Sequence, residues 1–419
     1  MDLVKLKIPG VRDHARAVMA GALLLLVAGC APSLRPAGKP MATVSFVLGS
    51  DAETGQDSKQ AIKNVDMADD LAHCSVNANT NTNVGISAAT DVHKHQKLFF
   101  RTIDGTLLAL QRWMPGPDAV SIVSGAACKA SAKADVEPGY ASGQALATAP
   151  QAVILGLHGF GDYANGFAEA GAQLAQQGIA VYAYDQRGFG RSPTRGFWPG
   201  ASSLVQDASD ALLVLHHLYP ATPVYLVGVS MGAAVATITA ASRPHVMDGV
   251  ILVSPAVWDR ADMPWYQTMP LAVLSHSLPW LPVSGRGLKI WPSDNIEMLR
   301  RLGRDRNMLS SVRVDMVAGV ADLMDMARLR AGDLDLPVLV MSGRKDQVIP
   351  PDVMASFVRD LSGMAKTASS TRIDKGSATI CVYEQGYHML LRDLNGPQVI
   401  DDLAMWIRGK PRDESSQCR

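Results

Sequence analysis

Short apolar runs alternate with longer amphipathic stretches along most of this 419-residue chain. The short runs predict strands at 98–103, 107–113, 152–157, 179–184, 224–229, 249–253, 336–342 and 378–383. The longer stretches predict helices at about 164–177, 202–218, 231–242, 351–361 and 396–409. Two neighbouring strands followed by strand–helix alternation are typical of an α/β fold, in which helices flank a mostly parallel central sheet.

Two segments interrupt this alternation. Residues 255–330 follow the sixth predicted strand and should form a helical cap, or lid, over the end of the sheet. Four tryptophans lie in this segment: Trp258, Trp265, Trp280 and Trp291. They line an apolar tunnel, pack the cap onto the core, or do both. Residues 117–149 are rich in Ala, Ser and Gly and predict a long irregular excursion. The catalytic core should then comprise 97–254 and 331–410, with 411–419 as a tail.

Residues 1–30 have the pattern of a targeting segment. A cationic start precedes an apolar run, residues 18–29, that is too short to cross a membrane comfortably. The run leads to Cys30 in a pattern that resembles a bacterial lipobox: Leu26-Val27-Ala28-Gly29-Cys30. This resemblance implies cleavage before Cys30 and a lipid anchor on it, in the bacterial cell envelope; the alternative is an uncleaved anchor helix. Ala31 favours the outer membrane over the inner one. Residues 31–96 are of low complexity and should be a tether.

The charge balance and the cysteines add few constraints. Lysines and arginines number 39, as do aspartates and glutamates, so no basic excess points to a nucleic-acid partner. We find no zinc-binding cluster, P-loop or dinucleotide fingerprint, and we expect neither metal nor cofactor. Four cysteines remain besides Cys30: Cys74, Cys128, Cys381 and Cys418. In an oxidising compartment they allow two bridges in three pairings; Cys381, in a predicted core strand, would otherwise be a buried thiol.

The strongest chemical signal lies between the strand at 224–229 and the helix at 231–242, and reads Gly228-Val229-Ser230-Met231-Gly232. A serine in such a sharp strand–turn–helix elbow has a strained backbone, and flanking glycines remove the steric clash. Ser230 should therefore project above the sheet edge as a nucleophile. The alternative is a Gly/Ser turn without chemistry.

A serine nucleophile needs a base and a group that orients the base. His388 is the favoured base, because it lies in the loop after the last predicted strand and so at the same sheet edge as Ser230. The other histidines considered lie on a predicted helix surface or in the polar leader: His216, His217, His73, His93 and His95. Asp346 follows the strand at 336–342 and is the favoured acid. Asp259, after the strand at 249–253, is its rival, although it opens the predicted cap.

Acyl transfer also needs backbone donors for the oxyanion. The Met231 N–H, directly after Ser230 at a helix N-terminus, should be one of them. The Phe160 N–H should be the other, because it lies in a glycine-containing loop after the strand at 152–157. His158 in that loop is expected to brace it and not to act as the base.

Five segments resemble the α/β-hydrolases of the monoacylglycerol lipase and lysophospholipase group. They are His158-Gly159-Phe160-Gly161-Asp162, Tyr184-Asp185-Gln186-Arg187-Gly188-Phe189-Gly190-Arg191-Ser192, Gly228-Val229-Ser230-Met231-Gly232, Gly343-Arg344-Lys345-Asp346 and Gly386-Tyr387-His388. The resemblance covers about 97–410, although Ala164-Asn165 departs from the serine often found there. It implies a serine hydrolase of lipid-derived esters that works through a Ser230–His388–Asp346 triad and an acyl-enzyme.

Three other functions stay open, because a triad does not choose between esters and amides and a fold does not prove catalysis. They are a small-ester carboxylesterase, a peptidase or amidase, and a non-catalytic surface lipoprotein that binds a partner. The expected partners are a lipid or small-ester substrate and, through the lipid anchor, a membrane.

Overall fold

The computed structural model describes residues 45–49, 97–116, 149–285, 289–362 and 378–409, together with Cys418. Of residues 45–49 it describes only the backbone. The predicted targeting segment, Cys30, Cys74 and Cys128, and nearly all of the excursion at 117–149 lie outside the described residues.

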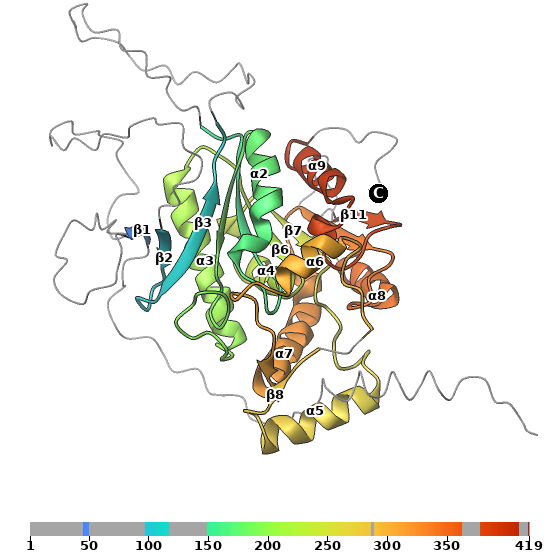
Figure 1. Ribbon diagram of the computed structural model, residues 1–419. Coiled ribbons are helices and arrows are strands. Elements are labelled where there is room, and N and C mark those ends of the chain that lie inside the picture. Colours follow the sequence, from blue (N-terminus) through green and yellow to red (C-terminus); the bar gives the residue numbers. More distant parts are fainter. Residues whose placement is uncertain are drawn as a thin grey trace, which may run out of the picture.

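The centre of the described chain is a twisted sheet whose strands run in the spatial order β1-β2-β3-β5-β4-β6-β7-β10-β11 (Figure 1). The strands are β1 (Ser45–Gly49), β2 (Lys97–Arg101), β3 (Leu107–Trp113), β4 (Ala152–Leu157), β5 (Ile179–Tyr184), β6 (Val224–Val229), β7 (Gly249–Val253), β10 (Val338–Gly343) and β11 (Ala378–Tyr383). The pairs β1–β2, β2–β3 and β3–β5 are antiparallel, and every later pair is parallel. The expected α/β-hydrolase sheet is thereby confirmed.

Helices cover both faces of this sheet. One face carries α2 (Ala168–Gln176) and α9 (Gly396–Ile407), and the other carries α3 (Ala201–Leu218), α4 (Met231–Ser242), α7 (Val314–Arg330) and α8 (Pro351–Ser362). Alternate residues of β4 point to opposite faces: Val153 and Leu155 join the cluster under α3 and α4, whereas Ala152 and Ile154 join the cluster under α2. Burial on both faces explains why β4 is apolar at every position.

Several predicted boundaries are corrected. The strand predicted at 98–103 ends at Arg101, because the Thr102 carbonyl accepts the Gly105 N–H in the turn that follows. The strand predicted at 336–342 begins two residues later, at Val338, because Pro337 has no N–H for a ladder and only its carbonyl is used, by Val250. The helix predicted from about 164 begins with a 3₁₀ turn, Ala164–Phe167, before α2.

Three strands of the described residues were not predicted: β1 and two strands of two residues each in the segment predicted to be a cap. β1 (Ser45–Gly49) pairs antiparallel with β2 inside the segment expected to be a tether. Its short apolar run is flanked by low-complexity sequence, and only an available sheet edge, supplied by β2, makes such a run a strand. As a result the predicted cap follows the seventh strand of the chain and not the sixth.

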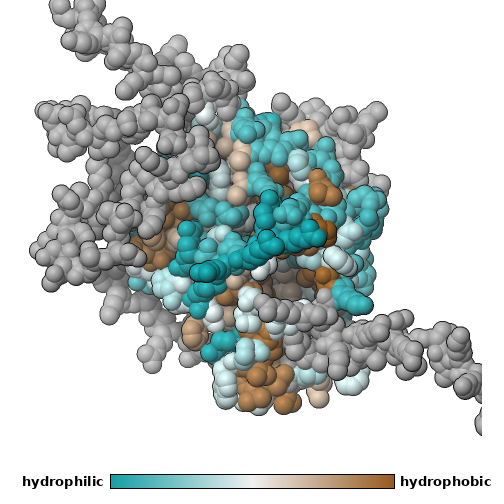
Figure 2. Space-filling view, viewed as in Figure 1, coloured by the Kyte–Doolittle hydropathy of each residue, from teal (hydrophilic) through white to brown (hydrophobic). Residues whose placement is uncertain are grey.

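The segment between β7 and β10 contains α5 (Trp265–Ser277), β8 (Pro282–Val283), α6 (Ile296–Leu302), β9 (Val312–Arg313) and α7. Its two long helices differ in burial. α7 packs on α4 and is largely buried, whereas α5 buries only Leu271. Trp265, Met269 and Val273 of α5 are exposed, and apolar side chains gather over α5 at the bottom of Figure 2. No helix in the described residues has the length and apolar character to cross a membrane.

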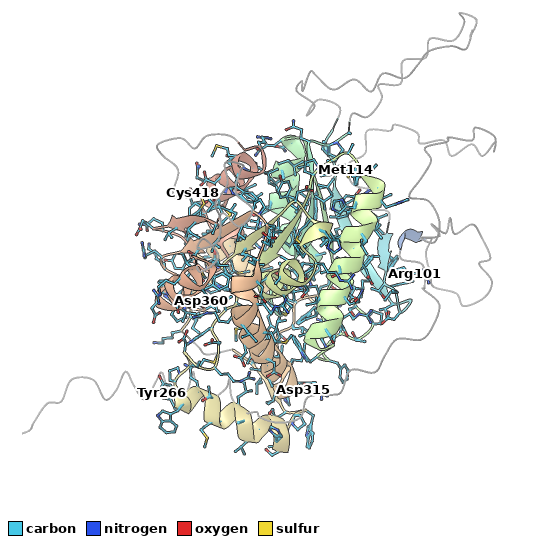
Figure 3. All side chains as sticks on the ribbon, turned by 180° about the vertical axis from the view of Figure 1, so that it is seen from behind. Arg101, Met114, Tyr266, Asp315, Asp360 and Cys418 are labelled. Atoms are coloured by element: carbon cyan, nitrogen blue, oxygen red, sulfur yellow. A yellow bond between two sulfur atoms is a disulfide. The ribbon has the colours of Figure 1, made fainter. Side chains whose placement is uncertain are left out.

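A disulfide joins Cys381 of β11 to Cys418. β11 is an edge strand of the sheet, and Cys418 forms an isolated antiparallel bridge with Cys381 (Figure 3). The alternative of a buried free thiol at Cys381 is therefore wrong, and Cys418 lies against the sheet edge at this point.

Candidate active site

Ser230 lies in a strained turn between β6 and α4, with a positive φ of 53°. Gly228 and Gly232, which flank this turn, have no room for a side chain. A Cβ at Gly228 would clash with the Gly232 carbonyl, and a Cβ at Gly232 would clash with the Leu157 carbonyl of β4. The turn therefore excludes a side chain at Gly228 and at Gly232, as expected of a nucleophile elbow.

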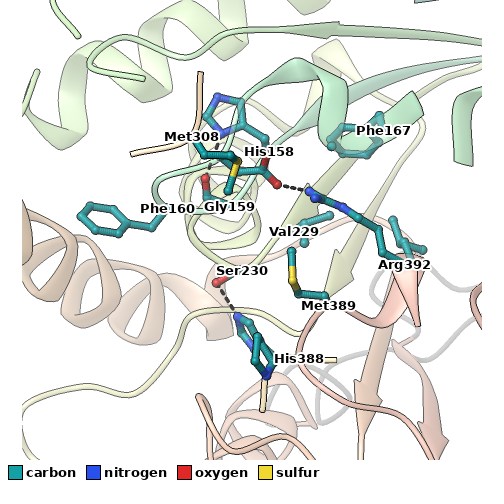
Figure 4. Close-up of a pocket in the computed structure, with 14 residues that line it drawn as sticks. His158, Gly159, Phe160, Phe167, Val229, Ser230, Met308, His388, Met389 and Arg392 are labelled. Carbon is teal, nitrogen blue, oxygen red and sulfur yellow. Dashed lines mark hydrogen bonds and ion pairs between the residues drawn. The ribbon is translucent and has the colours of Figure 1, made fainter. Parts of the chain in front are cut away.

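His388 lies within hydrogen-bond reach of both Ser230 (Figure 4) and Asp346. The His388 Nε2 lies 2.9 Å from the Ser230 Oγ, and the His388 Nδ1 lies 2.8 Å from the Asp346 Oδ2. An ionised carboxylate only accepts, so Nδ1 carries the ring proton and Nε2 is left to accept from the serine hydroxyl. His388 and Asp346 are both buried, which keeps this chain of hydrogen bonds away from bulk water.

The second oxygen of Asp346 explains why this acid keeps its position. Its Oδ1 accepts the backbone N–H groups of Val348 at 2.8 Å and Ile349 at 2.9 Å. The rival acid, Asp259, instead accepts the N–H of Asp262 within its own turn at the start of the cap. Within the described residues it is Asp346, and not Asp259, that contacts His388.

Both residues predicted to donate to the oxyanion belong to segments that lie against Ser230. Met231 is the first residue of α4, and a Cβ at Gly159, the neighbour of Phe160, would lie 3.4 Å from the Ser230 Cβ. Among the described residues, no acceptor takes a hydrogen bond from the backbone N–H of Phe160 or Met231. The Phe160 ring is held edge-on by Phe189, with ring centroids 5.5 Å apart.

His158 braces the loop that carries Phe160. Its Nε2 accepts the Gln186 N–H at 2.9 Å, so its Nδ1 donates to the Gly159 carbonyl, also at 2.9 Å. The Gln186 side chain returns a hydrogen bond of 2.8 Å to the His158 carbonyl. Burial lowers the pKa of His158 to about 4, and the ring is therefore neutral at physiological pH, as a structural brace requires.

A pocket opens beside Ser230 and His388, which both line it (Figure 4). Its apolar walls come from three parts of the chain: Phe160 and Phe167 near β4, Met308 in the cap, and Met389 after His388. Arg392 is the charged exception in this lining, along with its partner Asp162. Sequence reasoning missed Met308 and Arg392, since neither belongs to a motif.

Hydrogen bonds attach the cap to the loop that bears His388. The Pro292 carbonyl of the cap accepts the Met389 N–H at 2.8 Å. The Ser293 hydroxyl donates to Asp393 at 2.7 Å, and the other carboxylate oxygen of Asp393 accepts the Tyr387 N–H at 2.7 Å. Residues on both sides of His388 are therefore bound, directly or through Asp393, to one short segment of the cap.

A family model described as serine aminopeptidase, S33, matches residues 148–395, more than half of the chain. The chain belongs to the serine aminopeptidase S33 family. Its matched segment contains Ser230, Asp346 and His388, together with both predicted oxyanion donors.

Relatives of this S33 family member include proteins named as lipases. Human monoglyceride lipase is 26% identical over 271 residues, which are 62% of this chain and 82% of the human protein. Monoacylglycerol lipase of Mycolicibacterium smegmatis is 25% identical over 272 residues, 62% of this chain and 89% of that protein. A solved soluble variant of monoglyceride lipase from Saccharomyces cerevisiae shares the fold, with a TM-score of 0.56, 16% identity, and coverage of 74% of this chain and 94% of that one. Together these similarities support a carboxylic ester hydrolase.

Proposed function

We propose that this protein is a serine hydrolase of monoacylglycerol- or lysophospholipid-type esters that works through an acyl-enzyme. The observation that carries the proposal is the continuous hydrogen-bonded chain from Ser230 through His388 to Asp346, with contacts of 2.9 and 2.8 Å. The names of the relatives support the lipid part of the proposal, and so do the apolar walls of the pocket.

In the proposed mechanism, His388 takes the hydroxyl proton as Ser230 attacks the ester carbonyl. Asp346 holds the imidazole in the required tautomer and stabilises its positive charge. The N–H groups of Phe160 and Met231 donate to the oxyanion, and each such donor is worth roughly 10²- to 10³-fold in rate. His388 then gives its proton to the departing alcohol. In the second half of the reaction His388 takes a proton from water, which attacks the acyl-enzyme, and returns it to Ser230 as the acid product leaves.

The test compares two serines that both have a positive φ. Ser254 follows the neighbouring strand β7 with a φ of 44° and is buried, so Ser254→Ala matches Ser230→Ala in backbone and position. Ser230→Ala should abolish ester hydrolysis and labelling by a fluorophosphonate probe, while Ser254→Ala should keep both. Full activity in Ser230→Ala would refute the role assigned to Ser230.

A substrate panel separates the remaining alternatives. Acyl esters of increasing chain length and lysophospholipids should be hydrolysed with a maximum at long chains. A sharp fall beyond acetate would identify a small-ester carboxylesterase, and faster turnover of aminoacyl amides would identify a peptidase. A wild-type protein that the fluorophosphonate does not label would be a non-catalytic binding protein.

We also propose that Cys30 carries a lipid anchor in the bacterial envelope, with the outer membrane favoured. The support is sequence alone: a cationic start, a short apolar run and the lipobox-like residues before Cys30. A bacterial culture fed a clickable fatty acid should label the wild-type protein and leave Cys30→Ala unlabelled. Equal labelling of both proteins would refute attachment at Cys30. Membrane fractionation of the wild type tests whether the protein is in the outer or the inner membrane.

A further inference from the structure

A buried ion pair connects the two loops that the proposed reaction brings together. The Arg392 Nη2 contacts the Asp162 Oδ2. Asp162 ends the loop that carries Phe160, and Arg392 lies four residues after His388. Figure 4 shows Arg392 reaching from the His388 loop toward the loop of Gly159 and Phe160. Only 13% of the Arg392 side chain and 7% of the Asp162 side chain are exposed.

Both partners are also fixed to their own loops. The Asp162 N–H donates to the Gly159 carbonyl at 3.2 Å, and the other Asp162 oxygen accepts the Tyr163 N–H at 2.9 Å. The Arg392 N–H donates to the Met389 carbonyl at 2.7 Å. A displacement of the Asp162 carboxylate is therefore passed to the backbone of its loop through the Tyr163 N–H, and the backbone at Arg392 is held in its own turn.

The ion pair packs closely against Gly166, where there is no room for a side chain. A Cβ on Gly166 would clash with the Arg392 guanidinium and lie 2.8 Å from the Asp162 Oδ2. Burial also lowers the pKa of Arg392 to about 10, which reflects the cost of removing this cation from water. Because well-packed apolar residues often stabilise a fold as much as a buried ion pair does, stability alone does not account for two charges at this place.

The sheet by itself leaves the relative position of the two loops open. The Phe160 loop follows β4 and the His388 loop follows β11, and three strands, β6, β7 and β10, separate them. Yet the donor must reach the carbonyl oxygen of the same ester whose carbon is attacked by the serine that the base deprotonates. A misplacement of about 1 Å can cost roughly 10²-fold in rate. A direct connection across the top of the sheet meets this requirement.

We infer that Asp162 and Arg392 are positioning residues that hold the oxyanion loop against the base loop, so that the Phe160 N–H and His388 act on one ester carbonyl. This inference rests on the proposed function. Neither side chain takes part in the chemistry. Their effect should fall on kcat, which depends on how donor and base are aligned, and not on KM, which depends on the apolar walls of the pocket.

The test uses variants that break the pair in different ways: Arg392→Met, Asp162→Asn, the double variant, Gly166→Ala, which crowds the pair and keeps both charges, and the conservative Arg392→Lys. Active sites are counted with a fluorophosphonate that is allowed to react to completion, so that unfolded protein does not contribute to kcat. Each disruptive variant should lower kcat per titrated site about 10- to 100-fold, with KM changed far less. Arg392→Lys should retain more activity than Arg392→Met, and the double variant should be no slower than the slower single variant.

Arg301→Met is the matched control. Arg301 pairs with Glu169 at 3.3 Å between α6 and α2, but 61% and 57% of these side chains are exposed. This variant should keep the wild-type kcat. Wild-type kcat per titrated site in Arg392→Met or Asp162→Asn would overturn the inference and leave only a structural role, and so would multiplicative losses in the double variant. If the wild type hydrolyses no ester, the proposed function fails first, so the two failures are distinguishable.

Discussion

Replacing His158 by asparagine should remove one specific component of the acid sensitivity of folding. The buried ring has a pKa lowered by desolvation from 6.5 to about 4. Between these values the unfolded chain takes up a proton that the folded chain does not. The stability that depends on the neutral ring is therefore complete above pH 6.5 and is lost as the pH falls toward 4. At 1.36 kcal/mol per pKa unit, the loss amounts to about 3 kcal/mol.

Asparagine can still donate to the Gly159 carbonyl, but it leaves the Gln186 N–H without its acceptor. This should cost about 1–3 kcal/mol at neutral pH. Urea unfolding, followed by tryptophan fluorescence at about pH 7.5, 5.5 and 4, gives the free energy of unfolding of both proteins. The deficit of His158→Asn should shrink or vanish on acidification, because only the wild type loses the contribution of His158.

An exposed histidine supplies the control. His217→Asn on α3 should follow the wild-type pH dependence, since every other titrating group is unchanged and His217 is exposed. A deficit of His158→Asn that stays constant from neutral pH to about pH 4 would refute the reasoning, because it would mean that His158 takes up its proton equally in both states.

Two further predictions test the acid and the disulfide. Asp346→Asn should lower kcat for ester hydrolysis by roughly 10⁴-fold, because the imidazole of His388 is no longer held in the tautomer that can accept the serine proton. Asp259→Asn should keep kcat near that of the wild type. The reverse pattern would make Asp259 the acid. Cys418→Ala opens the bridge to Cys381, which spans a sequence separation of 37, and by loop entropy should lower the free energy of unfolding by about 3–4 kcal/mol. Urea unfolding measures this loss, and the two proteins should coincide once the wild type is reduced; a difference that persists in reductant would contradict the entropic origin.

Steric rules and sheet position explain why much of the site could be predicted from sequence. Parallel strands buried on both faces read as continuous apolar runs, and so β4 was predicted at its observed bounds. The glycines around Ser230 are required by clashes with backbone atoms, so they leave a pattern in the sequence. The strands before Asp346 and His388 end at the same sheet edge, which made these two residues candidates before any contact was known.

Contacts between loops leave no such pattern. Asp162 ends one of the five segments that carry the family resemblance, but Arg392 looks like an ordinary charged residue in the sequence. Only the loop conformations bring the two together. The bridge between Cys381 and Cys418 was one of several open pairings, since cysteine positions alone do not choose among them. β1 was missed for a related reason: an apolar run as short as Ser45–Gly49 becomes a strand only when another strand offers it an edge.

The same contacts limit which part of the cap can move while the site stays assembled. Pro292 and Ser293 are bonded to the loop of His388, directly and through Asp393. If this part of the cap moved away, it would release the backbone on both sides of His388. α5 is under no such constraint, because it buries only Leu271. An opening of the cap that preserves the Ser230–His388 contact must therefore leave Pro292 and Ser293 in place, whereas α5 is not bound in this way.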